Sequence, residues 1–302
     1  MSAHPIQAPA TIQRVLKRLA EYAELIKLEH SVFALPFALV GVLLATPAGH
    51  WPPIATVFWV IIAMVGGRTF AMALNRLLDA AIDAQNPRTQ SRALASGRLK
   101  RLEAWGIALM GLGLLVWSTL QLPSLCLKLL PIALLVLVGY SFTKRFTASA
   151  HWVLGFALGC GAVGGWVAVT GTLAWAPVAL GASVMLWVAG FDLIYACQDA
   201  DFDRHVGLFS VPARYGIATA LTISKVCHAL SVAGLAGTAL LIPGASWGLI
   251  AGTAIMSVFL LWEHRLIQVD NLDYLDMAFF TLNGWISVAV LGAVVAERLL
   301  HA

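Results

Sequence analysis

Long apolar stretches joined by short polar connections make up most of the chain. A bilayer crossing needs roughly 20 apolar residues in a helix, and nine stretches approach that length. They lie near residues 31–48, 53–78, 103–121, 124–143, 151–170, 176–197, 218–242, 246–262 and 276–296. The pattern predicts an all-α polytopic membrane protein with nine transmembrane helices, forming a single transmembrane domain over residues 1–302.

The first thirty residues have a different pattern. Apolar side chains recur at helical spacing while basic side chains occupy the opposite side. The apolar set is Ile12, Val15, Leu16, Leu19, Tyr22 and Ile26. A helix with one apolar and one basic face lies in the plane of a membrane surface. We therefore expect residues 1–30 to form an N-terminal amphipathic interfacial helix.

Positive charge is distributed unevenly among the connections. Those after the first, third, fifth and seventh stretches are short and lack Lys and Arg, whereas the others carry basic residues. Cytoplasmic loops are enriched in Lys and Arg. The N-terminus and the even-numbered loops are therefore predicted to be cytoplasmic, and the C-terminus is predicted to lie outside.

Composition narrows the class of protein further. Apolar residues make up 60% and charged residues only 11% of the chain, whereas soluble domains carry about a quarter charged residues. Soluble globular, disordered and disulfide-stapled secreted proteins are therefore excluded. The net charge of +4 is too small to indicate nucleic-acid binding. The isolated cysteines Cys126, Cys160, Cys197 and Cys227 form no CxxC pair, which predicts neither a disulfide nor a zinc site.

One acidic cluster falls at the end of the second predicted span. Asn75, Asp79 and Asp83 are spaced four residues apart and therefore share one face of a helix. Arg68, seven residues before Asn75, lies on that face deeper in the membrane. Stacked acidic side chains destabilise a helix unless something neutralises them. At a span end they mark a candidate functional site.

A second acidic cluster repeats this arrangement at the end of the sixth predicted span. Asp199 and Asp203 are again four residues apart, and Asp192 precedes Asp199 by seven, which predicts the same helix face one to two turns deeper. Asp201 points elsewhere and is expected to be solvated. The two clusters are offset by 120 residues. This spacing suggests two similar four-helix halves plus one added helix, with the acidic clusters face to face.

The two clusters supply hard oxygen ligands of the kind that Mg²⁺ uses when it bridges a protein to phosphates. The candidate metal ligands are Asn75, Asp79, Asp83, Asp199 and Asp203. Basic residues surround them, because Arg88 and Arg92 follow the first cluster and Lys144 ends the fourth predicted span, four residues after Tyr140. Carboxylates, Mg²⁺ and basic side chains together form a diphosphate clamp. A diphosphate on a lipid chain is the predicted ligand.

These motifs resemble those of the UbiA superfamily of intramembrane prenyltransferases. Asn75, Asp79 and Asp83 fit its NxxxDxxxD motif, and Asp199 and Asp203 fit its DxxxD motif. The remaining matches are a DxxY motif at Asp192 and Tyr195, a YxxxK motif at Tyr140 and Lys144, and an RTxxR run at Arg88 and Arg92. Each motif is weak alone, but the full set in this order is specific.

The resemblance implies a nine-helix bundle in which two Mg²⁺ ions bridge the carboxylates to a polyprenyl diphosphate. The motifs look most like the 4-hydroxybenzoate polyprenyltransferase-like subgroup. The implied reaction therefore transfers a polyprenyl group to an aromatic hydroxycarboxylate in respiratory quinone biosynthesis. Prenylation of 1,4-dihydroxy-6-naphthoate on the futalosine route to menaquinone is the alternative. The implied location is a bacterial-type inner membrane, with the active site facing the cytoplasm.

The expected mechanism is a dissociative aromatic substitution. Lys144, Arg88 and Arg92 bind the diphosphate oxygens, and departure of the diphosphate leaves an allylic cation. Asp192 and Tyr195 are expected to stabilise that cation, or Asp192 to remove the ring proton or orient the phenol. Apolar walls exclude the water that would otherwise trap the cation.

An aromatic carboxylate acceptor also needs a cation. Arg68 is one candidate because it faces inward from the second span, and Lys27 and His30, just before the first span, are others. Lys27 fits equally well as an interfacial lysine whose charged end reaches toward water.

Two other classes of function compete. A membrane transporter also uses repeats and intramembrane charge, but here the charge lies on one side only. A non-catalytic scaffold would not need both acidic clusters. Among prenyltransferases, haem, chlorophyllide and glycerol phosphate are less favoured acceptors. His151, His205 and His228 do not cluster at ligand spacing and are interpreted as solvated or helix-end residues.

Overall fold

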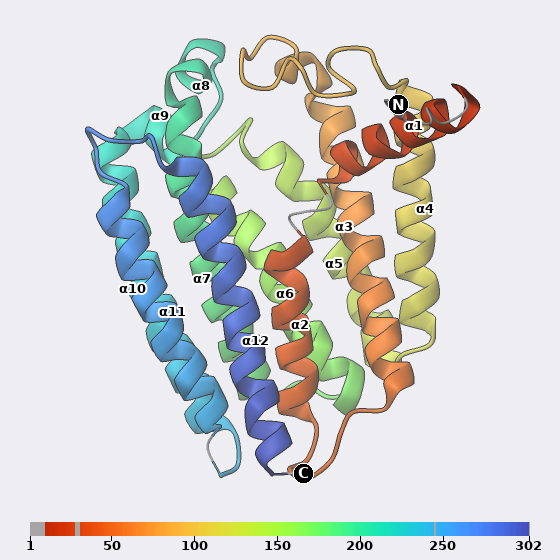
Figure 1. Cartoon of the computed structure of the whole chain (residues 1–302), viewed down its shortest axis with the longest axis vertical. Coiled ribbons are helices and arrows are strands. Elements are labelled where there is room, and N and C mark those ends of the chain that lie inside the picture. The colour runs from red at the N-terminus through yellow and green to blue at the C-terminus, as the bar shows by residue number, and fades with distance from the viewer. Residues whose placement is uncertain (1–9, 28–30, 245, 302) are drawn as a thin grey trace, which may run out of the picture.

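The computed structural model describes residues 10–27, 31–244 and 246–301, which form helices and no extended strand (Figure 1). In chain order the α-helices are α1 Ala10–Ile26, α2 Ser31–Ala45, α3 Ile54–Asp83, α4 Arg101–Leu120, α5 Ser124–Thr143, α6 Ala150–Thr170, α7 Trp175–Tyr195, α8 Ala200–Val206, α9 Val211–Tyr215, α10 Ile217–Leu241, α11 Trp247–Leu266 and α12 Asn283–Leu300. A 3₁₀ helix, η2 Ala196–Asp199, joins α7 to α8, and a π-helix, η3 Met277–Leu282, runs into α12.

Eight helices within the described residues are long and apolar enough to cross a membrane. They coincide with the predicted spans from the second to the ninth. The first predicted span, 31–48, corresponds to α2, which is apolar but has only 15 residues and contains Pro36. The all-helical membrane architecture is therefore confirmed, whereas only eight of the nine predicted spans are long and apolar enough to cross a membrane within the described residues.

The helix α2 lies inside the bundle rather than at its edge. Phe37, Ala38, Val40 and Val42 are at most 1% exposed. Glycines let α6 approach α2 closely: a Cβ atom added to Gly165 would lie 2.0 Å from the carbonyl oxygen of Ala38. Small residues at such crossings permit the backbone contact on which helix packing in membranes depends.

The acidic clusters and the helix α1 lie at the same end of the bundle. In Figure 1 this end carries α1, α8, α9 and the segment that joins α3 to α4, and α12 ends at the opposite end. The apolar side chains Ile12, Val15, Leu16 and Leu19 of α1 are about half exposed, from 49% to 58%. Part of the predicted 1–30 segment is thus helical, while residues 1–9 and 28–30 lie outside the described residues.

Two histidines expected to be solvated or at helix ends are buried, although His151 does lie at a helix end, as the second residue of α6. His151 is 3% exposed and His228 is 2% exposed. The Nδ1 atom of His228 lies 2.9 Å from Nε2 of His264, so two neighbouring helices share a polar contact. His205 is exposed, as predicted. The spacing of histidines along the chain misled the prediction because their partners come from other helices.

Candidate functional site

The first acidic cluster forms the last two turns of α3. The side-chain amide of Asn75 donates to Oδ2 of Asp79 at 3.0 Å, as their spacing on one helix face predicts. Asp79 is 2% exposed, and its carboxylate accepts from Lys144 Nζ at 2.6 Å and from Arg145 at 3.2 Å. Two basic partners offset part of the free-energy cost of burying this carboxylate.

Asp83, at the end of α3, contacts one arginine of α3 and one of the segment that follows it. Oδ1 of Asp83 accepts from Arg92 at 2.7 Å, and Oδ2 lies 3.8 Å from Nη1 of Arg76. The hydroxyl of Thr89 donates to the backbone oxygen of Asp83 at 3.0 Å. These contacts fold the connecting segment 84–100 back over the end of α3 and bring its arginines to the cluster.

The second acidic cluster does not continue α7 as a regular helix. The helix α7 ends at Tyr195, the 3₁₀ turn η2 carries Asp199, and α8 carries Asp203. Because a 3₁₀ turn has fewer residues per turn than an α-helix, the predicted single face from Asp192 to Asp203 is broken. The prediction of one shared face is wrong for this cluster, and Asp192 and Asp199 contact different elements.

Asp199 faces the segment that follows the first cluster. Both of its oxygens accept from the guanidinium of Arg88, with Nε at 2.9 Å from Oδ1, and Asn86 Nδ2 donates to Oδ1 at 3.0 Å. Arg88 also donates to the hydroxyl of Tyr195 at 3.1 Å. Burial lowers the pKa of Arg88, but the hydrogen bond and charge of Asp199 outweigh this and raise the pKa above its usual value. Arg88 therefore stays charged.

Unlike Asp199, Asp192 directs its side chain toward α6. Its Oδ2 lies 2.7 Å from Nδ1 of His151, the second residue of that helix. Asp201, by contrast, is 97% exposed at its side chain, as the sequence predicts, and pairs only with Arg204.

A cavity of about 190 Å³ lies between the two acidic clusters. Its lining includes all five candidate metal ligands, Asn75, Asp79, Asp83, Asp199 and Asp203. Arg88, Arg92 and Lys144 line the same cavity. No three acidic, histidine or cysteine side chains among the described residues converge on one point, and the carboxylates of Asp79, Asp83 and Asp199 instead contact basic side chains. We call this space the acidic cavity.

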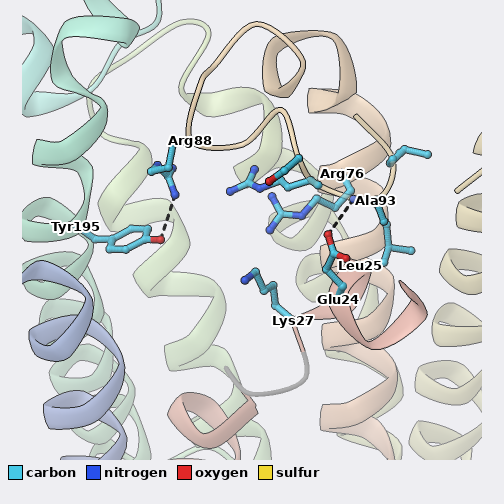
Figure 2. A pocket seen from close by; sticks show the side chains of 10 residues that line it. Glu24, Leu25, Lys27, Arg76, Arg88, Ala93 and Tyr195 are labelled. Atoms are coloured by element: carbon cyan, nitrogen blue, oxygen red, sulfur yellow. Dashed lines mark hydrogen bonds between the residues drawn. The ribbon is translucent and has the colours of Figure 1, made fainter. Parts of the chain in front are cut away.

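A second cavity of about 300 Å³ adjoins it and shares Arg76, Arg88 and Arg92 with it. Figure 2 shows Lys27, Arg76 and Arg88 around this space, with the ring of Tyr195 on one side and Leu25 on the other. Its acidic lining residue, Glu24, is already bonded to both terminal nitrogens of Arg98. We call this space the basic pocket.

Lys27, which lines the basic pocket, has an unusual backbone conformation. Its φ is +50°, the left-handed region that residues other than glycine seldom adopt. Arg68 donates from Nη2 to the backbone oxygen of Lys27 at 2.9 Å. Arg68 therefore supports Lys27 rather than lining either cavity.

The remaining predicted site residues fall into three groups. Tyr195 lines the basic pocket, whereas Tyr140 donates to the backbone oxygen of Ala71 at 3.3 Å and lines neither cavity. Asp192 also lies outside both linings. His30 lies outside the described residues.

Sequence reasoning missed several residues that line the two cavities or contact a candidate site residue. Four polar ones are Arg76, Asn86, Arg145 and His151. Arg76, one residue after Asn75, carried a usable signal because a buried arginine in an apolar span needs an acidic partner. The other three carry no such local signal because they lie far along the chain from the carboxylates they contact.

Residues 34–285 match the model of the UbiA prenyltransferase family. The chain belongs to the UbiA prenyltransferase family. A relative named 4-hydroxybenzoate octaprenyltransferase, from Thiobacillus denitrificans, is 29% identical over 293 residues, which cover 95% of this chain and 97% of the relative. The chain spans about half the length of another family member, the mitochondrial 4-hydroxybenzoate polyprenyltransferase of Aedes aegypti, with 29% identity over 239 residues, 76% of this chain and 52% of the relative.

Solved structures of the family agree with this assignment. The apo structure of a UbiA homologue from Aeropyrum pernix K1 superimposes with a TM-score of 0.80 at 31% identity, over 89% of this chain and 98% of that one. A UbiA homologue from Archaeoglobus fulgidus, bound to GPP and Mg²⁺, has a TM-score of 0.72 at 18% identity, over 92% of this chain and 99% of that one. At that identity the second likeness shows the fold alone.

Proposed function

We propose that this protein transfers a polyprenyl group from a polyprenyl diphosphate to an aromatic hydroxycarboxylate of the 4-hydroxybenzoate type, with Mg²⁺ and in respiratory quinone biosynthesis. The observation that carries the proposal is the pair of adjoining cavities. One has five oxygen-bearing side chains among its basic residues, and the other has Lys27, Arg76, Arg88 and Arg92 beside the ring of Tyr195. The names of the relatives support the same activity.

The acidic cavity fits a metal-bound diphosphate. Its carboxylates and the oxygen of Asn75 are hard donors, which suit Mg²⁺, an ion that keeps waters and bridges to phosphate. When bound, two Mg²⁺ ions would supply neutralisation of the leaving diphosphate. Arg88, Arg92 and Lys144 line the same cavity, so each is placed to exchange its carboxylate partner for a diphosphate oxygen. Charge-assisted bonds of this kind are among the strongest available.

The basic pocket fits the acceptor. A carboxylate there meets the ammonium of Lys27, while Leu25 and Leu94 give the ring apolar contacts. The hydroxyl of Tyr195, which lines this pocket, accepts from Arg88, and Arg88 lines both cavities. An aromatic ring bound in the basic pocket would lie beside the allylic carbon of a diphosphate bound in the acidic cavity. Carbon–carbon bond formation requires this proximity.

We place the chain in a bacterial-type inner membrane with nine spans. Eight apolar helices and the buried α2 supply those spans. The charged connections share the end of the bundle where both cavities lie, so by the positive-inside rule this end, with the N-terminus, is cytoplasmic and the C-terminus is outside.

The test is a membrane assay with a labelled polyprenyl diphosphate and two acceptors in parallel, 4-hydroxybenzoate and 1,4-dihydroxy-6-naphthoate. We expect a lipid-soluble product with 4-hydroxybenzoate that disappears with a chelator and returns with Mg²⁺. Product from the naphthoate alone would move the enzyme to menaquinone synthesis. Uptake of ligand that depends on membrane potential, without any product, would instead indicate a transporter.

Lys27 provides a separate prediction for the acceptor side. Lys27→Met removes the ammonium but keeps the length of the side chain, so KM for 4-hydroxybenzoate is expected to rise about 10-fold, the cost of losing one charge-assisted hydrogen bond. KM for the polyprenyl diphosphate should stay within error of wild type. The matched control is Lys17→Met, in the exposed half of α1. Equal KM values for the acceptor in the two variants would place the acceptor elsewhere.

A further inference from the structure

The basic pocket contains an acidic side chain to which the proposed function gives no role. It belongs to Glu24, near the end of α1. A carboxylate in a pocket that binds an anion repels that anion unless its charge is balanced. Arg98 supplies the balance, because Oε2 of Glu24 accepts from its Nη1 at 3.0 Å and Oε1 accepts from its Nη2 at 2.9 Å. A bidentate pair of this kind also fixes the relative orientation of the two side chains.

Glu24 also bonds to the backbone of the segment that faces α1 across the pocket. The backbone N–H of Ala93 donates to Oε1 of Glu24 at 2.9 Å, and Figure 2 shows this bond. Arg98 in turn donates from Nη2 to the backbone oxygen of Ser91 at 2.6 Å. Glu24, Ser91 and Ala93 all line the basic pocket. The side chain of Glu24 therefore joins two walls of that pocket, α1 and residues 91–98.

Lys27 depends on this junction because it follows α1 in a strained conformation. Its φ of +50° lies in the left-handed region, which persists only where the surrounding structure holds it. The N–H of Lys27 donates to the backbone oxygen of Glu24 at 3.3 Å, and the backbone oxygen of Lys27 accepts from Arg68 at 2.9 Å. Glu24 therefore holds this turn with its backbone and anchors it to residues 91–98 with its side chain.

Other contacts fix the part of the same segment that faces the acidic cavity. Arg88 pairs with Asp199, and Arg92 pairs with Asp83. Neither pair involves α1. The acceptor side and the diphosphate side of the segment are thus anchored by different carboxylates. A change at Glu24 should therefore affect binding of the acceptor and leave binding of the diphosphate unaltered.

We infer that Glu24 is a positioning residue for the acceptor, which fixes the ammonium of Lys27 in the basic pocket by joining α1 to residues 91–98. Both oxygens of Glu24 are engaged by Ala93 and Arg98, so Glu24 acts through Lys27 and not by direct contact. A fixed ammonium spares the acceptor the cost of ordering a flexible side chain on binding. The inference rests on the proposed function, in which Lys27 meets the acceptor carboxylate.

Steady-state rates with 4-hydroxybenzoate and a polyprenyl diphosphate test this role. In Glu24→Ala, KM for 4-hydroxybenzoate is expected to rise about 10-fold, as in Lys27→Met, because the ammonium no longer has a fixed position. KM for the polyprenyl diphosphate, and kcat at saturating acceptor, should change less than twofold. Glu24→Gln keeps an oxygen that accepts from Ala93 and should recover part of the lost affinity for the acceptor.

A double-mutant cycle shows whether Glu24 acts through Lys27. Lys27→Met already removes the ammonium, so adding Glu24→Ala should leave KM for the acceptor near 10-fold above wild type. Independent effects would multiply to about 100-fold and overturn the role of Glu24. An unchanged acceptor KM in Glu24→Ala overturns it as well, and so does an equal rise in KM for both substrates.

Controls separate this role from folding and from the proposed function. The side chains of Arg98 and Glu24 are 40% and 35% exposed, and exposed pairs contribute little to stability, so Glu24→Ala should unfold at the wild-type temperature. If it does not fold, Glu24→Gln replaces it in the cycle. Asp201→Ala breaks another exposed pair, with Arg204, away from both cavities, and should keep the wild-type KM for the acceptor.

The wild type itself distinguishes the two proposals. Absence of product from the wild type overturns the proposed function and this inference with it. Product from the wild type, with multiplying effects on KM in the double variant, overturns the role of Glu24 alone.

Discussion

Replacing Asp199 with alanine is expected to lower prenyl transfer by about 1,000-fold or more, the effect of removing a principal electrostatic contributor to a transition state. The carboxylate lines the acidic cavity and accepts from both Asn86 and Arg88. Its loss removes a proposed metal donor and leaves Arg88 without its counter-charge. The measurement is initial rate in membranes at saturating Mg²⁺, with protein amounts matched.

The matched control is Asp201→Ala. Asp201 lies two residues away but is 97% exposed at its side chain and pairs only with Arg204, a kind of surface pair that contributes about 1 kcal/mol or less. Its activity should equal that of wild type. Retention of more than a tenth of wild-type activity by Asp199→Ala would remove Asp199 from the site and weaken the metal assignment.

Replacing Gly165 with valine is expected to disrupt the bundle itself. A Cβ at this position would lie 2.0 Å from the carbonyl oxygen of Ala38, and a Cβ at Gly41 would lie 2.2 Å from that of Ala162. The obstacle is backbone on both sides, so α2 and α6 must separate. The expected loss is about 3 kcal/mol, the upper part of the range for overpacking. Thermal unfolding in detergent measures it.

Gly164→Val is the control for Gly165→Val. It tests whether the destabilisation comes from the close contact of α2 and α6 or from replacing any glycine of α6 with valine. A Cβ at Gly164 meets nothing within 4 Å. Its unfolding temperature should stay near or slightly above that of wild type, since glycine is a poor helix former. Equal unfolding temperatures for the two valine variants would contradict the close crossing of α2 and α6.

Local periodicity predicted the parts of this protein that are regular helices. The long apolar stretches became helices near the predicted bounds, and Asn75 contacts Asp79 as their spacing requires. The same rule failed after Tyr195, because the chain changes there from an α-helix to a 3₁₀ turn. Neither hydropathy nor charge marks that change, so the different orientations of Asp192 and Asp199 were not predictable.

Contacts between residues far apart in the chain could not be predicted from the sequence either. Asn86 and Asp199 are 113 residues apart, and His151 and Asp192 are 41 apart. Such pairs depend on how whole helices pack, and a single sequence records that only through short-range spacing. The acidic residues of the NxxxDxxxD and DxxxD motifs line one cavity, whereas Asp192 of the DxxY motif does not. The motifs could not show which basic side chain faces each carboxylate.

If metal and diphosphate bind in the acidic cavity as proposed, its ion pairs make the two binding events mutually dependent. Asp79, Asp83 and Asp199 are each satisfied by a basic side chain. A divalent ion arriving alone must displace a guanidinium or an ammonium that then has no anion nearby. A diphosphate arriving with it gives that cation a new partner. Linkage then requires each to raise the apparent affinity of the other by the same factor. The proposed site would therefore discriminate against free metal without a separate selectivity element.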